Sequence, residues 1–149
     1  LLFGARGEVN NSYICVKLKV MGKVFNFIVK VLLWVWQLPQ HLCALVYMNR
    51  PFDRIDTPIR HYERHGWFGG GSVTLGEYIF TNKWASVALL RHEYGHVVQS
   101  RMLGPLYLVV IGIPSIIHAA VHKKVCKGKP YNHFYTEKWA DSLGGKYFK

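Results

Sequence analysis

The chain has 149 residues, of which 50% are apolar and 15% aromatic, and its formal net charge is +11 at pH 7. This length suits one domain with a modest core, and the apolar content is high for a freely soluble protein. A basic chain can bind nucleic acid, but here the basic residues stand at the ends of apolar stretches and outside any recognisable nucleic-acid-binding fold. We therefore expect membrane lipid as a partner and no nucleic acid.

Residues 1–23 carry no recognisable functional motif. Leu1 is not an initiator, whereas Met21-Gly22-Lys23 begins a pattern of a basic residue followed by an apolar run, which looks like a natural start. Residues 1–20 also lack the small-residue cleavage site of a signal peptide. We interpret residues 1–23 as a non-native or basic N-terminal leader.

Residues 24–48 form the first apolar stretch. Lys30 and the polar group from Gln37 to His41, which includes Pro39, weaken a simple membrane-spanning interpretation. Tryptophans lie beside the polar break, and their amphipathic rings suit a lipid–water interface. The pattern predicts a membrane-associated helical segment that is bent or lies at the interface.

Residues 49–81 are polar and mixed in charge, and they end in a run of β-branched and aromatic residues from Ser72 to Thr81. That run predicts a strand, or a tight hairpin turning at Gly76, packed on the following helix. His61 and His65 share a four-residue spacing, but their carboxylate has the wrong offset for a zinc motif and glycines follow. We expect a solvated turn of helix there.

A proline-free stretch from Trp84 to Met102 has small and apolar residues at helical spacing. Within it, His92 and His96 are four residues apart, so both imidazoles project from one helix face and can converge on one cation. Glu93 then lies beside the open coordination position, where it can act as a proton acceptor. The sequence predicts zinc binding at this face.

Two histidines leave zinc short of the three protein ligands that catalytic sites usually supply. Glu137 is the candidate for the third, at the start of an amphipathic helix that Thr136 would cap. Asp141 follows one turn later on the same face, where it can hold a ligand imidazole from behind.

The second apolar stretch, Leu103 to Val121, carries no charge and is broken at Gly104-Pro105 and again at Gly112 to Pro114. Because Glu137 must return to the histidines, this segment has to leave and return on one side of a bilayer. We predict a re-entrant or interfacial hairpin over residues 103–122, bent near the second break; the alternative is a buried helical pair in a soluble core. Lysines follow His118 and His122, which favours contact with lipid headgroups for that pair.

Three further residues near Glu137 are candidates for the donor that would stabilise an oxyanion: Tyr131, His133 and Tyr135. No spacing rule selects among them, and each fits equally well as a packed or interfacial side chain. The three cysteines, Cys15, Cys43 and Cys126, are odd in number and widely separated. They predict packed or lipid-facing thiols, and neither a disulfide framework nor a metal knuckle.

The run His92-Glu93-Tyr94-Gly95-His96, with Glu137, Ala140, Asp141 and Gly144 downstream, resembles the gluzincins. Within that group it is similar to membrane-associated zinc peptidases with a Glu-x-x-Ala-Asp-x-x-Gly element. The resemblance implies zinc ligation by His92, His96 and Glu137, general base catalysis by Glu93, and orientation of a histidine by Asp141. It also implies that an edge strand beside the site holds the substrate extended; the strand before the motif helix is the candidate.

The sequence thus predicts a mainly α (α+β) fold with a zincin-like motif helix, a short β-strand or hairpin, and membrane-associated helices. Residues 49–149 would form the catalytic domain, and the expected activity is zinc-dependent hydrolysis of peptide bonds in a peptide or protein substrate. The alternative is a non-catalytic membrane protein with a structural zinc site or a degenerate zincin fold. Lysines and arginines flank the apolar stretches on all sides, so charge bias predicts no orientation.

Overall fold

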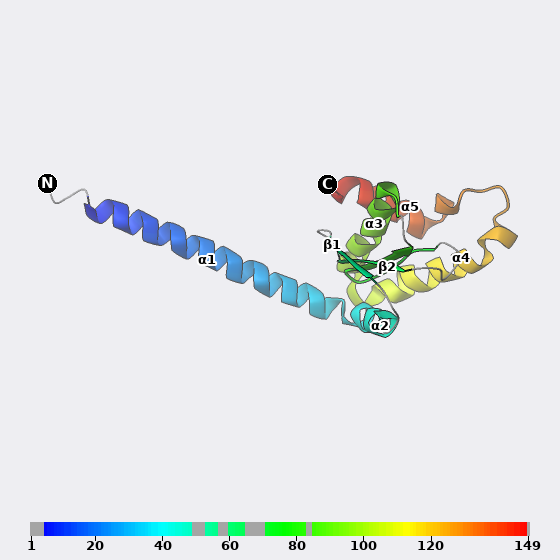
Figure 1. Ribbon diagram of the computed structural model, residues 1–149, viewed down its shortest axis with the longest axis horizontal. Coiled ribbons are helices and arrows are strands. Elements are labelled where there is room, and N and C mark those ends of the chain that lie inside the picture. Colours follow the sequence, from blue (N-terminus) through cyan, green and yellow to red (C-terminus); the bar gives the residue numbers. More distant parts are fainter. Residues whose placement is uncertain (1–4, 49–52, 57–59, 65–70, 83–84, 149) are drawn as a thin grey trace. The chain divides into compact units, whose positions relative to one another are not determined.

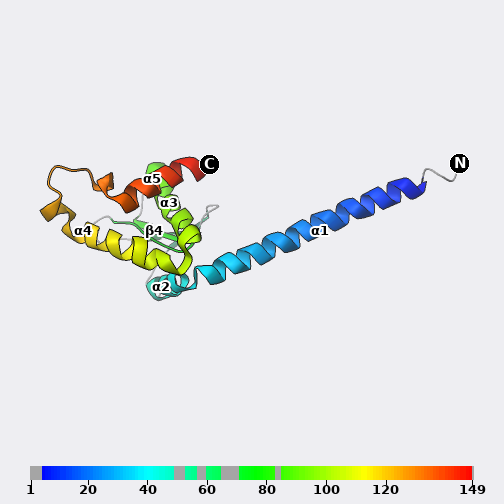
Figure 2. The ribbon, with the colours of Figure 1, turned by 180° about the vertical axis from the view of Figure 1, so that it is seen from behind.

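A computed structural model describes the backbone of residues 5–48, 53–56, 60–64, 71–82 and 85–148, and it gives side-chain environments for residues 19–48, 61–63, 71–82 and 85–148. The chain divides into two compact units, residues 1–35 and 36–149. The fold is mainly α with one small sheet, as predicted (Figures 1 and 2).

The N-terminal unit is a single helix, α1, which runs from Ala5 to Trp36. It continues through Met21 without a break. From Val20 to Val35 its large apolar side chains are mostly exposed, including Phe25 and Phe27 at about two thirds of their area. This helix therefore has an apolar surface that the unit itself does not bury.

The second unit begins with α2, Leu38–Met48, which is separated from α1 by Gln37. The break lies where the polar interruption was predicted. Its physical cause is Pro39, which has no backbone N–H and disfavours helical geometry in the residue before it. The polar side chains at the break are buried: Gln37 accepts a hydrogen bond from Ser100 Oγ at 2.9 Å, and Gln40 donates to the Gly104 carbonyl. They bind the start of α2 to the end of the motif helix.

A four-stranded sheet follows, in the order β1-β2-β4-β3. Its strands are β1 Asp53–Asp56, β2 Arg60–Arg64, β3 Val73–Leu75 and β4 Tyr78–Asn82. β1 pairs with β2 and β3 with β4 in antiparallel fashion, whereas β2 and β4 are parallel. The predicted hairpin is confirmed, with Gly76 in the turn at φ 65°, and β3 is an edge strand.

The expectation of a helical turn around His61 was wrong. His61 lies in β2, is 2% exposed, and its Nε2 is 2.6 Å from Thr81 Oγ1 on β4. Pairing with the buried strand β4 determines the conformation of this segment. His65, the other member of that pair, is outside the described residues.

The sheet has a helix on each face. On one face Tyr78 and Phe80 of β4 pack against Ala44 of α2, with the Tyr47 and Phe80 rings 4.9 Å apart. On the other face Thr74 of β3 reaches Glu93 of α3, the motif helix, which runs from Val87 to Leu103. The sheet therefore presents one edge strand directly to the motif helix.

α3 starts three residues later than predicted, because the Ser86 side chain caps it by accepting a hydrogen bond from the Leu89 N–H at 3.1 Å. It ends before Gly104-Pro105, where a short 3₁₀ segment, η2 Gly104–Leu106, redirects the chain. The first of the two predicted breaks is therefore the real change of direction.

The predicted bend near Gly112 to Pro114 is not present. A π-helical turn, η3 Leu108–Gly112, leads directly into α4, Ile113–Val125, and the two form one helix of 18 residues. Pro114 has no N–H to donate to the Val110 carbonyl one turn back, which explains the irregular turn. Tyr135 satisfies that carbonyl instead, with its hydroxyl at 2.5 Å.

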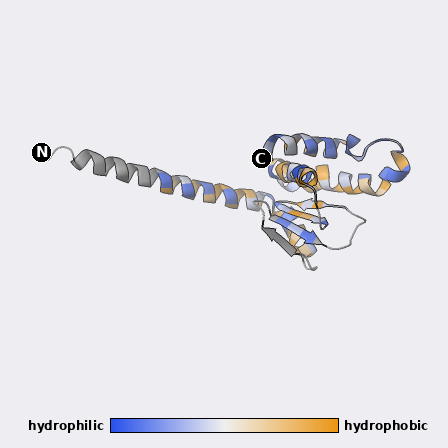
Figure 3. Cartoon of the chain, turned by 45° about the horizontal axis from the view of Figure 1, so that its top comes forward, coloured by the Kyte–Doolittle hydropathy of each residue, from blue (hydrophilic) through white to orange (hydrophobic). Residues whose placement is uncertain are grey.

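Among the described residues, Leu108–Val125 is the one helix that is long and apolar enough to cross a bilayer alone, and Lys19–Trp36 with Leu38–Met48 pass the same test as a pair. Only 11% of the Leu108–Val125 segment is buried, so it is not the buried core helix of the alternative interpretation. Its apolar residues contrast with the polar surface of the following helix (Figure 3). The large apolar residues that are more than half exposed are Val109, Ile113, Ile116, Ile117 and Val125.

The chain returns through a 3₁₀ turn, η4 Tyr131–His133, into α5, Tyr135–Tyr147. Thr136 does not cap α5 as predicted, because the helix begins two residues earlier, at Tyr135, and Thr136 is buried in its first turn. The Thr136 hydroxyl donates instead to the neighbouring Glu137 carboxylate at 3.0 Å.

α5 lies antiparallel to α3, and two glycines allow their backbones to touch (Figure 1). A Cβ on Gly95 would be 1.9 Å from the Ala140 carbonyl oxygen, and a Cβ on Gly144 would be 2.0 Å from the Arg91 carbonyl oxygen. Real Cβ atoms do not approach backbone atoms so closely, so any larger residue would force the helices apart. The glycines thus set the distance between the helices that carry the candidate ligands.

We expect Gly144→Ala to destabilise the protein by at least about 2 kcal/mol, through overpacking against backbone that cannot move aside. Gly145→Ala is the matched control, because a Cβ there meets nothing within 4 Å; it should be neutral or stabilising by up to about 1 kcal/mol. Denaturant unfolding of both variants in detergent tests this, and equal stability of the two would contradict a backbone-level contact.

Candidate metal centre

Side chains of α3 and α5 bring the three predicted ligands together. His92 Nε2 is 3.2 Å and His96 Nε2 is 3.6 Å from the same atom, Glu137 Oε2. The ligand atoms of the three residues all lie within 4.8 Å of one another, and the two imidazole rings are nearly perpendicular, with centroids 4.9 Å apart. This is the convergence that the four-residue spacing and the distant glutamate predicted.

Each histidine is held through its other ring nitrogen. His92 Nδ1 is 2.7 Å from Asp141 Oδ1, and His96 Nδ1 is 2.7 Å from Gln99 Oε1. A carboxylate and an amide oxygen only accept, so both Nδ1 atoms carry the proton and both Nε2 atoms face the centre. Metal-binding histidines are held in this way.

The sequence interpretation missed Gln99. Its amide is oriented by a second hydrogen bond, from Nε2 to the Thr136 carbonyl at 3.0 Å, which leaves Oε1 facing His96. Gln99 is fully buried on the site face of α3, three residues after His96. That spacing is the only signal that could have identified it, because residues three apart on a helix are neighbours.

Glu137 has two hydroxyl partners, one of them unforeseen. Ser115 Oγ on α4 donates to Glu137 Oε1 at 2.8 Å, and Thr136 Oγ1 donates to the same oxygen at 3.0 Å. Oε1 is therefore fully engaged, and Oε2 is left for the two imidazoles. The apolar stretch Leu103–Val121 thus contributes a polar side chain, Ser115, to the centre. The composition of the stretch did not indicate this role.

The charges at the centre are strongly coupled. Burial alone would raise the pKa of Glu137, but hydrogen bonds from His92, His96 and Ser115 outweigh it and hold that pKa well below its usual range. Burial would lower the pKa of His92, but its hydrogen bonds to Glu137 and Asp141 outweigh this effect and raise the pKa to about 9. The pKa of His96 is raised against burial for the same reason. Protons therefore hold the positions that a cation could take.

Glu93 is 3% exposed and directed toward the edge strand. Its Oε2 accepts a hydrogen bond from Thr74 Oγ1 at 2.5 Å, and its Oε1 accepts one from Ser72 Oγ. Its charge contributes to the raised pKa values of His92 and His96, so it lies within electrostatic reach of both. The carboxylate is thus fixed beside the histidines by the strand.

Asp141 was predicted to hold one of the two imidazoles and contacts that of His92. It is itself held by a second residue. Asn132 Nδ2 donates to Asp141 Oδ2 at 3.2 Å, which directs the other oxygen to the imidazole. Asn132 belongs to η4, and no motif or spacing in the sequence selects it.

The structure separates the three candidate oxyanion donors. Burial and the negative charges of Glu137 and Glu93 raise the pKa of Tyr131 to about 12, so its hydroxyl lies in the field of the site. The Tyr135 hydroxyl is bound to the Val110 carbonyl, and the His133 ring faces His118 and His122.

Tyr107 is a further residue that the sequence interpretation missed. It is 3% exposed, and burial together with the charges of Glu93 and Glu137 raises its pKa above its usual value. Its hydroxyl donates to the Thr74 carbonyl of β3 at 3.3 Å. It joins the segment after α3 to the edge strand beside Glu93.

The donor set fits zinc. Two imidazole nitrogens and one carboxylate oxygen are the three protein ligands of many catalytic zinc sites, which leave a fourth position open. Both imidazoles are oriented by acceptors on their far sides, and the carboxylate oxygen that faces them is free of other hydrogen bonds in the described part of the chain.

Comparison of the chain with known protein families, with curated proteins and with solved structures finds no match in any of the three.

We expect Gln99→Met to lower zinc affinity by about 10–100-fold, because it removes the acceptor that holds His96 Nδ1–H and leaves a buried donor unsatisfied. Lys138→Met, an exposed change on α5, is the control and should bind like the wild type. Competition with a chelating dye measures both affinities. Equal affinities would contradict the positioning role of Gln99.

Proposed function

We propose that this chain is a membrane-associated zinc metallopeptidase of the gluzincin type. The observation that carries the proposal is the convergence of His92 Nε2, His96 Nε2 and Glu137 Oε2, with the Glu93 carboxylate fixed beside them. A purely structural zinc site would use four protein ligands. Here three converge, and the group beside the remaining position is a buried carboxylate.

Zinc held by His92, His96 and Glu137 would lower the pKa of a coordinated water and polarise the scissile carbonyl. Glu93 accepts the proton that the attacking water loses and then donates it to the leaving amine. Ser72 and Thr74 keep the Glu93 carboxylate directed at the reaction site throughout. Asp141 and Gln99 keep the two imidazoles in the tautomer that has Nε2 available.

An extended peptide is the substrate form that suits this arrangement. β3 is an edge strand, and its Thr74 binds Glu93, so a chain added along β3 would pass beside the general base. Main-chain hydrogen bonds to an edge strand select an extended backbone and tolerate many side chains. The expected substrate is therefore a peptide or protein segment without regular structure.

Tyr131 is the donor that we assign to the oxyanion. Its raised pKa reflects burial and the nearby charges of Glu137 and Glu93, so its hydroxyl stays protonated and lies near the reacting groups. Tyr135 has its hydroxyl committed to Val110, and the His133 ring faces two other histidines. Tyr131 is the candidate whose pKa responds to the charges of Glu137 and Glu93. Its ring also packs against His118 and His122, as the His133 ring does.

Lipid attachment is supported by the exposed face of α4. Ile113, Ile116 and Ile117 are each more than half exposed, while Ser115 on the opposite side reaches Glu137. Because Ser115 lies near the middle of the 18-residue helix Leu108–Val125, a membrane-spanning orientation of this helix would place Glu137 inside the bilayer. An orientation along the membrane surface, with lysines 123 and 124 at the headgroups, satisfies both constraints.

The chemistry is tested with Glu93→Gln, which keeps a hydrogen-bonding side chain for Ser72 and Thr74 but cannot accept a proton. We expect full zinc content and a loss of peptide cleavage of about 100-fold or more, measured by mass spectrometry on a mixed peptide library in detergent. Glu77→Gln is the matched control, since Glu77 forms a half-exposed ion pair with Arg101 at 3.2 Å outside the centre.

Equal cleavage by the wild type and Glu93→Gln would exclude Glu93 as the base. A wild type that binds one zinc through His92, His96 and Glu137 but cleaves nothing in the library would favour the non-catalytic alternative.

The membrane assignment is tested separately by expressing the chain, separating membranes without detergent, and labelling them with a photoreactive phospholipid. We expect the protein in the membrane fraction and label on the exposed apolar face of α4, because burying each isoleucine there stabilises attachment by roughly 1.5–3 kcal/mol. Val87, equally exposed at the start of α3, is the internal control and should remain unlabelled. A protein found wholly in the soluble fraction would refute the assignment.

A further inference from the structure

A second cluster of metal-binding side chains lies at the far end of α4. His118, His122 and Cys126 follow one another at four-residue intervals, which places them along one face of the helix. One donor atom of each residue lies within 4.8 Å of the donor atoms of the other two. None of them belongs to the centre formed by His92, His96 and Glu137.

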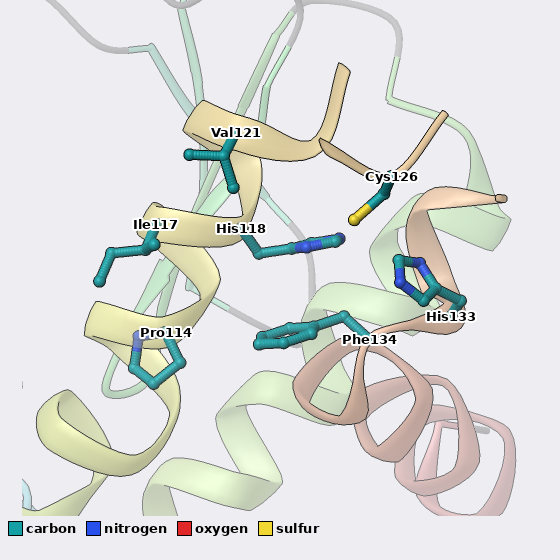
Figure 4. Close-up of a pocket in the computed structure, with 7 residues that line it drawn as sticks. All are labelled: Pro114, Ile117, His118, Val121, Cys126, His133 and Phe134. Atoms are coloured by element: carbon teal, nitrogen blue, oxygen red, sulfur yellow. The ribbon is translucent and has the colours of Figure 1, made fainter. Parts of the chain in front are cut away.

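His133 faces this cluster from η4. Its ring centroid is 5.2 Å from that of His118 and 5.7 Å from that of His122. Figure 4 shows the Cys126 sulfur directed toward the end of the His118 ring, with His133 beside the same gap. His133 Nδ1 is 2.8 Å from the Pro130 carbonyl, which can only accept, so Nδ1 carries the proton and Nε2 keeps its lone pair.

The surroundings of the cluster are apolar. A pocket there is lined by Pro114, Ile117, Val121 and Phe134 together with His118, Cys126 and His133. The Phe134 ring stacks on the His118 ring with centroids 4.4 Å apart and fixes its plane. His122 Nδ1 is buried and has no hydrogen bond of normal geometry in the described part of the chain, and the Lys129 backbone is a polar contact of this ring. A polar atom in that position needs an explanation, and a bound ion supplies one.

We propose that His118, His122, Cys126 and His133 form a second site for a divalent transition metal, with zinc as the ion that three imidazoles and one thiolate select. Zinc–ligand distances of about 2.0–2.3 Å place tetrahedral donor atoms about 3.4–3.6 Å apart, so His118, His122 and Cys126 need side-chain shifts on the order of 1 Å. His133 lies outside that group of three and has to rotate further to become the fourth ligand. Binding transfers the Cys126 thiol proton to solvent and replaces it with the metal. His118 Nε2 is 3.1 Å from the Tyr131 carbonyl oxygen. If the metal binds to this nitrogen, that hydrogen bond is lost.

Four protein ligands leave no open position, so this site is structural. Exposed Lys123, Lys124 and Lys127 repel a cation by at most about 1 kcal/mol each through water. Structural zinc sites contribute about 10–16 kcal/mol, so the repulsion does not decide the outcome. The metal would fasten the end of α4 to η4, the segment whose Asn132 holds Asp141 at the first centre.

The test is metal content together with the absorption spectrum of the full chain loaded with Co²⁺ in detergent. A cobalt–thiolate bond gives a charge-transfer band in the near ultraviolet that nitrogen and oxygen ligands do not give. We expect two metal ions per chain and this band in the wild type. Cys126→Ser should retain one metal ion and lose the band.

Two matched variants make the result specific. Cys15→Ser/Cys43→Ser leaves Cys126 as the only thiol and should keep both metal ions and the band. His92→Ala/His96→Ala removes the first centre and should keep one metal ion and the band, so failure of the proposed peptidase site does not affect this test. A wild type without the band, or a band that persists in Cys126→Ser, overturns the second site.

Discussion

The contact between the backbones of α3 and α5 is the constraint on which the candidate centre depends. His92 and His96 come from one helix and Glu137 from the other, and their side chains meet because Gly95 and Gly144 allow the helices to touch. Neither glycine carries chemistry. Both nevertheless lie inside the two motifs, so each motif encodes a helix interface as well as its ligands, and the interface aligns the ligands along the helix axes.

Around that interface each candidate ligand has its own support. Asp141 and Asn132 hold His92, Gln99 and the Thr136 carbonyl hold His96, and hydroxyl groups hold Glu137. Buried charges are costly unless they are paired and hydrogen-bonded. Such complete pairing explains how carboxylates and imidazoles coexist at low exposure, and a group that is already oriented loses little freedom when it binds a cation.

The sequence predicted the candidate ligands, Glu93, Asp141 and the β3–β4 hairpin. The helical period places His92 and His96 on one face, whereas Glu137 followed from the need for a third ligand and from the resemblance to gluzincins. The sequence did not identify Gln99, Ser115 or Asn132, since their roles depend on contacts between distant segments. β1 and β2 were missed because they are short and polar, and β2 pairs with a strand that is not its neighbour in sequence. The bend was expected at Pro114, but Tyr135 supplies the hydrogen bond that this proline removes.

Hydrogen bonds fasten the Leu108–Val125 helix to α5: Ser115 donates to Thr136 and Glu137, and Tyr135 donates to the Val110 carbonyl. If the chain is the proposed peptidase, an apolar helix seated in lipid would hold the candidate catalytic groups at a constant height above the bilayer. Bonds of a membrane-anchored polypeptide would then be cleaved according to how far they stand from the lipid surface, with little regard to their local sequence. For such an enzyme, the distance of a peptide bond from the membrane surface would determine cleavage more than the side chains around that bond.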